Sequence, residues 1–63
     1  MWVIPVVKID MWSGRTPEQK KKLIEGITDA FIGIGTPKEA VHIIINDVSK
    51  ENWGTSGKPA SEL

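Results

Sequence analysis

One segment with helical periodicity lies between two segments with the character of strands, and this order limits the fold more than any other feature. Segment 2–11 is rich in β-branched residues and alternates from Val6 onward, which predicts a strand. Segment 41–48 is almost continuously apolar, which predicts a second strand buried on both faces. Two strands joined through a helix are expected to be parallel. We therefore expect an α/β (α+β) fold built on a β-α-β unit.

The intervening segment has the features of a helix with defined ends. Thr16 is a good N-cap, and Gln19 can bond back to the cap backbone. Gly35 is expected to end the helix, and two internal glycines, Gly26 and Gly33, are expected to mark close contacts with the sheet. Apolar residues recur with spacings of three and four, which predicts one apolar stripe: Leu23, Ile24, Ile27, Ala30, Phe31 and Ile34.

The chain is short for the amount of apolar surface that it carries. Its 63 residues are expected to form a single domain, 1–63, ending in a turn-rich segment that forms a short hairpin or an arm reaching a neighbouring subunit. A domain of this size buries only about 60% of its unfolded surface. The chain has no cysteine for a disulfide, yet 40% of its residues are apolar and three are tryptophan. Self-association is therefore expected.

Composition also limits the partners. The formal net charge is zero, which argues against nucleic acid, because nucleic-acid-binding domains are usually basic. No apolar stretch approaches the roughly 20 residues of a membrane span. The apolar start ends at Lys8 without a cleavage pattern, so it is not a signal peptide, and a cytoplasmic protein is expected. His42 is the only histidine and there is no cysteine, so no structural metal site is predicted.

Three stretches together resemble the 4-oxalocrotonate tautomerase family: Pro5 at the start of segment 5–10, the run Gly-Arg-Thr-Pro-Glu-Gln-Lys at 14–20, and the tail 52–57. The resemblance covers nearly the whole chain after residue 4, so residues 1–4 form an extension ahead of the family start. It implies β-α-β protomers assembled into a hexamer, a trimer of dimers, with pockets at subunit contacts. It also implies an enzyme with no metal and no organic cofactor.

The resemblance implies a role for four residues. The family's N-terminal proline, whose secondary amine is the catalytic base, falls on Pro5. Its first arginine, which polarises the substrate, falls on Arg15, and its C-terminal aromatic residue, which shapes the pocket, falls on Trp53. The second arginine, which binds a carboxylate, falls on His42, where imidazole is a weaker carboxylate ligand than guanidinium. The implied function is an isomerase that tautomerises a small unsaturated 2-hydroxy or 2-keto acid.

This set of residues suits proton transfer. A buried amine beside a cation such as Arg15 has a lowered pKa, because both effects disfavour the protonated form, and a base poised near the operating pH transfers protons well. Arg15 can stabilise negative charge on the substrate oxygen, while Trp53 can exclude water.

Hydration or dehalogenation of a substituted acrylate is an alternative reaction, and it would need a carboxylate that activates water. Asp47 is not assigned that role and is expected to serve a turn or a subunit contact.

The extension leaves three possibilities open. Residues 1–4 are removed, or initiation occurs at the Ile4 codon, and the nitrogen of Pro5 becomes free. Alternatively, they remain, continue the first strand through Trp2, Val3 and Ile4, and impair catalysis because the nitrogen is then an amide. In the third possibility the chain is a non-catalytic oligomeric subunit, and the extension packs in a subunit interface. Retention of Arg15 and Trp53 argues against the second and third possibilities, whereas the apolar segment 2–4, which has the pattern of a strand continuation, argues against the first.

Overall fold

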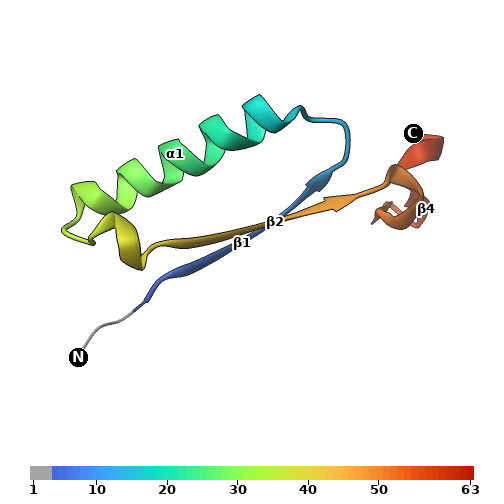
Figure 1. Cartoon of the computed structure of the whole chain (residues 1–63). Coiled ribbons are helices and arrows are strands. Elements are labelled where there is room, and N and C mark those ends of the chain that lie inside the picture. Colours follow the sequence, from blue (N-terminus) through green and yellow to red (C-terminus); the bar gives the residue numbers. More distant parts are fainter. Residues whose placement is uncertain (1–3) are drawn as a thin grey trace.

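The computed structural model describes residues 4–63, and its main body is the predicted β-α-β unit followed by a small hairpin (Figure 1). Strands β1 and β2 are parallel neighbours in one sheet, and β3 and β4 form an antiparallel pair. The predicted order and strand direction are therefore confirmed. The elements are β1 (Val6–Trp12), α1 (Pro17–Gly33), the 3₁₀ helix η1 (Lys38–Ala40), β2 (His42–Val48), the 3₁₀ helix η2 (Lys50–Asn52), β3 (Gly54–Thr55), β4 (Lys58–Pro59) and the 3₁₀ helix η3 (Ala60–Glu62).

The boundaries of β1 differ from the sequence prediction at both ends. The strand begins at Val6, and exposed Ile4 lies outside it; the predicted strand residues Trp2 and Val3 lie outside the described part of the chain. Trp12, which lies one residue beyond the predicted strand 2–11, is the last residue of β1 and is paired with Val48. The pairing continues one residue further, because the Ser13 N–H donates to the Val48 carbonyl oxygen at 3.0 Å.

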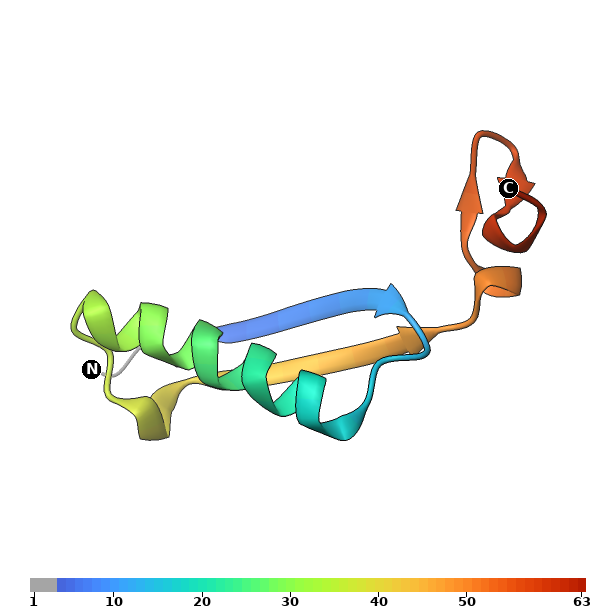
Figure 2. The same ribbon diagram turned by 90° about the horizontal axis from the view of Figure 1, so that it is seen from above.

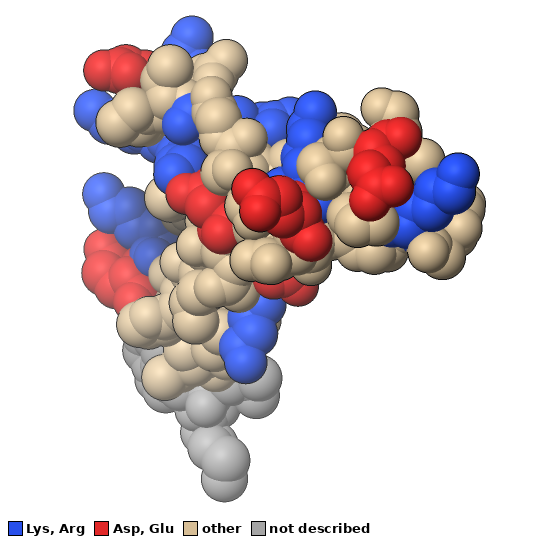
Figure 3. Space-filling view, turned by 90° about the vertical axis from the view of Figure 1, so that its right-hand side faces the viewer, with Lys and Arg blue, Asp and Glu red and all other residues tan. Residues whose placement is uncertain are grey.

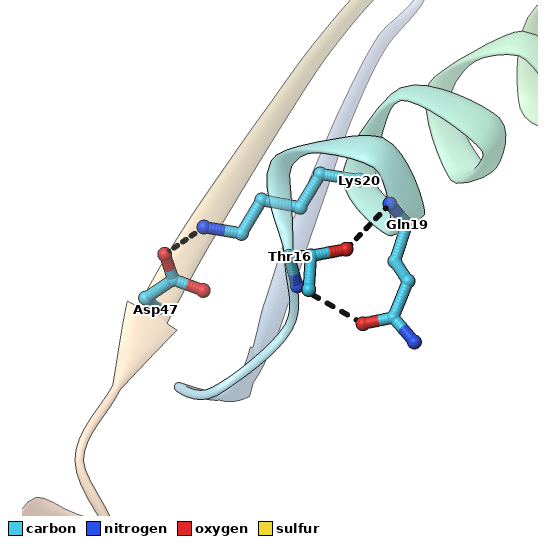
Figure 4. Close-up of polar contacts among 4 residues, drawn as sticks. All are labelled: Thr16, Gln19, Lys20 and Asp47. Carbon is cyan, nitrogen blue, oxygen red and sulfur yellow. Dashed lines mark hydrogen bonds and ion pairs between the residues drawn. The ribbon is translucent and has the colours of Figure 1, made fainter.

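Both predicted ends of α1 are confirmed. Thr16 forms a capping box: its hydroxyl accepts from the Gln19 N–H at 3.2 Å, and its own N–H donates to Gln19 Oε1 at 2.9 Å (Figure 4). At the other end the Gly35 N–H bonds to the Ile32 carbonyl and the Thr36 N–H to the Phe31 carbonyl, each at 3.0 Å. This is a Schellman motif, and it requires the positive φ of 96° that Gly35 adopts.

Helix α1 covers one face of the two-stranded sheet (Figures 1 and 2). The helix residues Leu23, Ile27 and Phe31 are half-buried, as are the alternate strand residues Val7, Ile9, Met11, Ile43 and Ile45. The apolar stripe is thus narrower than predicted, because Ile24 and Ile34 are 39% and 77% exposed. The expected close approach of Gly26 and Gly33 is wrong for the protomer, since a Cβ on either would meet no atom within 4 Å.

The opposite face of the sheet is open. Val6 and Ile44 are 54% and 45% exposed, so the prediction that segment 41–48 is buried on both faces is wrong within one protomer. Among residues 4–63 only Ala40 and Ala60 are buried apolar residues. The accessible surface is 4962 Å², whereas a compact monomer of 7.0 kDa has about 4,000 Å². A single protomer therefore has no closed core.

The C-terminal arm, residues 49–63, projects beyond the end of the sheet (Figures 1 and 2). It contains the predicted hairpin, β3 with β4, whose turn residues Ser56 and Gly57 both have positive φ, 53° and 76°; this combination is typical of tight two-residue hairpin turns. The arm gives the Cα trace a radius of gyration of 14.9 Å, whereas a compact chain of this length has about 10–11 Å. Within residues 4–63, no helix is long and apolar enough to cross a membrane.

Candidate active site

Pro5 and His42 lie together at the edge of the sheet where both strands begin. The His42 N–H donates to the Pro5 carbonyl oxygen at 3.0 Å, and His42 is paired with Val6. Pro5 is half-buried, and His42 is exposed on the face of the sheet that α1 does not cover. Two of the residues predicted from the resemblance are therefore neighbours through the backbone pairing of β1 and β2.

Arg15 lies at the other edge of the sheet, in the turn that joins β1 to α1. Gly14, with a φ of 121°, lets the chain reverse there, since this conformation is costly for residues that have a Cβ. Arg15 is exposed and immediately precedes the N-cap Thr16. Within residues 4–63 no hydrogen bond or ion pair engages its guanidinium group. The group is thus free to bind an anionic or carbonyl ligand.

Trp53 lies near the same edge as Arg15, where the C-terminal arm leaves β2. Its ring meets that of Trp12 edge to face, with centroids 5.9 Å apart and an interplanar angle of 78°. Its carbonyl oxygen accepts the Ala60 N–H at 2.7 Å, which holds it against η3. Half-buried Trp53 and 38% exposed Trp12 thus form an apolar surface, here called the tryptophan wall.

Two residues of this region were not predicted from the sequence. Trp12 lies just beyond the predicted strand 2–11, although the alternation that begins at Val6 places it on the same face as Lys8 and Asp10. Lys50, in η2, places its ammonium nitrogen 4.8 Å from the centroid of a Trp12 ring, which is a cation–π distance. The proximity of Trp12 to residues 50 and 53 depends on the pairing of β1 with β2, which local sequence does not reveal.

The four predicted residues are therefore not brought together in one protomer. Pro5 and His42 lie at the start of the strands, and Arg15 and Trp53 lie beyond their ends. Seven strand residues separate these edges by about 20 Å at the usual rise of about 3.3 Å per residue. A small acid cannot span both groups. A site that uses all four residues needs a second copy, oriented so that its Arg15 and Trp53 approach the first copy's Pro5.

Asp47 has a structural partner within the protomer. It lies in β2 and accepts a hydrogen bond and ion pair from Lys20 of α1 (Figure 4). The expectation of a turn is therefore wrong, because Asp47 lies within β2 and links it to the helix, while the subunit contact stays a prediction. On the uncovered face, the Asn46 side-chain amide donates to Asp10 at 3.1 Å. Within residues 4–63, no group of three His, Cys, Asp or Glu side chains could hold a metal ion.

Charges of both signs are interspersed on the face seen from the end of the sheet where the arm projects (Figure 3). Basic side chains there lie beside acidic ones, and apolar or neutral atoms separate them. An extended basic surface is not seen in this view.

Comparison with known proteins gives a consistent result. The family model described as tautomerase enzyme matches residues 5–62. A 2-hydroxymuconate tautomerase of Comamonas testosteroni is 46% identical over 61 residues, which cover 95% of this chain and 97% of that protein.

Solved structures also resemble the chain, both in sequence and in fold. A structure of the 4-oxalocrotonate tautomerase isozymes of Methylibium petroleiphilum has a TM-score of 0.84 and 46% identity, covering 90% of this chain and 94% of its own. A heterohexameric 4-oxalocrotonate tautomerase of Chloroflexus aurantiacus has a TM-score of 0.83 and 30% identity, covering 92% and 95%.

Proposed function

This chain belongs to the family of tautomerase enzymes and is a tautomerase-like isomerase, and we propose that its reaction is the enol–keto tautomerisation of a small unsaturated 2-hydroxy or 2-keto acid. The observation that carries the proposal is the family match over residues 5–62, which begins at the proline proposed as the base. The reaction moves a proton without net oxidation, so the proposed mechanism uses side chains and one amine alone.

Pro5 is the proposed proton shuttle when its nitrogen is a free secondary amine. The amine accepts the proton of the enol hydroxyl, and the O–H electrons form the π bond of the carbonyl. The carbon–carbon π electrons of the conjugated system shift and form a C–H bond with the proton that the protonated amine returns. Arg15 stabilises the negative charge that develops on oxygen. His42 contacts the substrate next to Pro5. The tryptophan wall excludes water, which strengthens these electrostatic interactions.

The active unit in this proposal is an oligomer of identical chains. The separation of about 20 Å between the edges of the sheet means that Pro5 and Arg15 of one copy cannot contact the same small acid. The open sheet face, with Val6 and Ile44 exposed, supports association, because a protomer without a closed core is marginal alone. A hexamer arranged as a trimer of dimers is proposed, since a related structure is a heterohexamer.

The first experiment determines whether the amine is free. Intact mass and N-terminal sequencing of the chain from its native host show whether it begins at Pro5 or at Met1. The same material is assayed for ketonisation of 2-hydroxymuconate and phenylenolpyruvate. We expect a chain that begins at Pro5 and turns over at least one enol acid.

Arg15→Ala and Trp53→Ala then test the site, with Lys21→Ala on the exposed face of α1 as the control. We expect at least a tenfold loss of kcat/KM for Arg15→Ala, because a lost charge-assisted hydrogen bond costs about 1.5–3 kcal/mol. Turnover that both substitutions leave unchanged would reject the proposed site. A chain that begins at Met1 and turns over neither acid would indicate a catalytically silent oligomeric subunit.

A further inference from the structure

Trp12, at the end of β1, is contacted by two side chains of the C-terminal arm, those of Lys50 and Trp53. We propose that Trp12 and Lys50 are positioning residues, which together hold the indole of Trp53 in the orientation that the reaction requires. Their influence on turnover rests on the proposed function and passes through Trp53. The positioning itself is a property of the fold, so it can be measured without a substrate.

Trp12 provides a fixed point for these contacts. It is the last residue of β1 and is paired with Val48, and the next bond of the pairing, from the Ser13 N–H to the Val48 carbonyl oxygen, measures 3.0 Å. Side chains on regular elements are held more precisely than those on loops. The Trp12 indole is therefore presented by paired backbone, although the residue is 38% exposed.

Lys50 and Trp53 belong to one turn of the arm, which is closed by the Trp53 N–H bonding to the Lys50 carbonyl oxygen at 3.3 Å. In a 3₁₀ turn, side chains three residues apart lie on the same side, so both can meet the same ring. The Lys50 ammonium nitrogen lies 4.8 Å from a Trp12 ring centroid. The ring centroids of Trp12 and Trp53 are 5.9 Å apart at an interplanar angle of 78°, which is a favourable edge-to-face arrangement. Two contacts fix the orientation of this turn on Trp12, whereas a single contact would leave it free to rotate.

Little else in the protomer holds the Trp53 ring. Within residues 4–63, no hydrogen bond joins arm residues 49–63 to the β-α-β unit. The bond from the Ala60 N–H to the Trp53 carbonyl oxygen, at 2.7 Å, stays inside the arm. Trp53 is half-buried, so no core fixes its rotamer, and a side chain serves a site well only when its neighbours lock that rotamer. Loss of Trp12 should therefore release both the Trp53 ring and the arm.

The Lys50 ammonium group has the Trp12 indole as its partner. In the described part of the chain, residues 4–63, the one ion pair is between Lys20 and Asp47, so no carboxylate there draws Lys50 away from the ring. A cation over the face of an indole is attracted by the electrons of the ring. Lys50 thus adds an electrostatic contact to the edge-to-face contact of the two tryptophans.

Hydrogen exchange tests the positioning without a substrate. The Ala60 N–H, which bonds to Trp53, should exchange about threefold faster in Lys50→Gln, because the cation–π contact is lost. It should exchange about tenfold faster in Trp12→Ala, which removes both contacts. Lys50→Arg should restore the parent rate, since guanidinium also stacks on aromatic rings. Lys58→Gln changes the other lysine of the arm and is the matched control, which should leave the rate unchanged.

Circular dichroism reports the contact between the two indoles directly. Two indoles in edge-to-face contact couple their electronic transitions and give a paired signal. Trp2 is replaced by phenylalanine in every protein compared, so that the signal comes from Trp12 and Trp53 alone. We expect this signal in the parent chain, and we expect Lys50→Gln to weaken it and Lys50→Arg to preserve it.

A double-mutant cycle on turnover then shows whether Trp12 acts through Trp53. Trp12→Ala should lower kcat for phenylenolpyruvate about threefold to tenfold, and Trp12→Phe should stay within about twofold because it keeps an aromatic edge. In a Trp53→Ala background, the same Trp12→Ala change should alter kcat by less than about twofold, since the residue that it positions is absent. Effects that multiply instead would mean that Trp12 acts on the substrate independently, and they would overturn the positioning role.

Each proposal can fail alone. Unchanged Ala60 exchange in both Lys50→Gln and Trp12→Ala, or no coupled indole signal in the parent chain, would overturn the inference even if both enol acids are turned over. Faster exchange in these variants without turnover of either acid by the parent chain would support the positioning and reject the tautomerase reaction. Sedimentation confirms that each variant is assembled. Lys50→Gln, a change of an exposed side chain, keeps the test decisive if Trp12→Ala does not assemble.

Discussion

The backbone N–H of His42 is hydrogen-bonded to the carbonyl oxygen of Pro5 at 3.0 Å, so the start of β2 holds the residue that precedes β1. Through this bond His42 lies next to Pro5, the proposed proton shuttle, on the neighbouring strand of the same protomer. The chemistry at position 42 should therefore influence how a substrate lies against Pro5.

Replacing His42 by arginine should improve the binding of dicarboxylates. His42→Arg places a guanidinium group beside Pro5, and its two parallel N–H donors match a carboxylate better than imidazole does. We expect KM for 2-hydroxymuconate to fall about fivefold to tenfold, while KM for phenylenolpyruvate changes less. His42→Gln is the neutral control. Identical KM values in all three proteins would show that residue 42 does not face the substrate.

The uncovered sheet face should be the surface through which copies associate. Ile44→Asp places a charge on that face, where the native side chain is 45% exposed, and burying an unpaired charge is costly. We expect sedimentation to show a smaller assembly. Turnover should also be lost, because Pro5 and Arg15 of one copy then lack the partner residues of a second copy.

Ile32→Asp is the matched control for that experiment, since Ile32 on α1 is also 45% exposed. It should leave the mass of the assembly unchanged. Dissociation of Ile32→Asp with an intact Ile44→Asp assembly would place the interface on the helix instead of the sheet.

The ion pair between Lys20 and Asp47 should contribute little to stability. Their side chains are 29% and 36% exposed, and pairs with that exposure to solvent typically contribute 1 kcal/mol or less. A double-mutant cycle with Lys20→Ala and Asp47→Ala should give a coupling energy of about 0.5 kcal/mol in chemical denaturation, decreasing with added salt. A coupling energy of several kcal/mol would mean that assembly buries the pair.

Substitution by alanine should change the free energy of unfolding in opposite directions at two glycines. Gly26 is exposed in the interior of α1, and nothing lies within 4 Å of an added Cβ, so Gly26→Ala should raise the free energy of unfolding by about 1 kcal/mol. Gly35 has a φ of 96° in the Schellman motif, so Gly35→Ala should lower it by about 1 kcal/mol or more.

Both variants are compared by thermal denaturation at one protomer concentration, because the stability of an oligomer depends on concentration. Destabilisation by Gly26→Ala would show that a neighbouring subunit approaches the helix at that residue.

Local features of the structure were predictable because neighbouring residues determine them. The period of the apolar residues predicted α1 and β1, and a continuous apolar run predicted β2. Thr16, Gln19 and Gly35 predicted the ends of α1, where hydrogen bonds join residues three to five positions apart. The strand direction followed from the helix between the strands. Burial was predicted less well. The continuous apolar run at 43–45 suggested that both faces of the strand are buried, whereas in one protomer α1 covers only one face of the sheet.

The sequence by itself determined the β-α-β order, the capped helix and the residues that resemble a tautomerase site. Only the tertiary structure decided where those residues lie: Pro5 with His42 at one edge of the sheet, Arg15 and Trp53 at the other, and Trp12 against Trp53 with Lys50 above it. The physical reason is the range of the interactions involved. Capping and periodicity act over one or two turns of chain, whereas these contacts depend on the register of two strands whose paired residues are 36 positions apart.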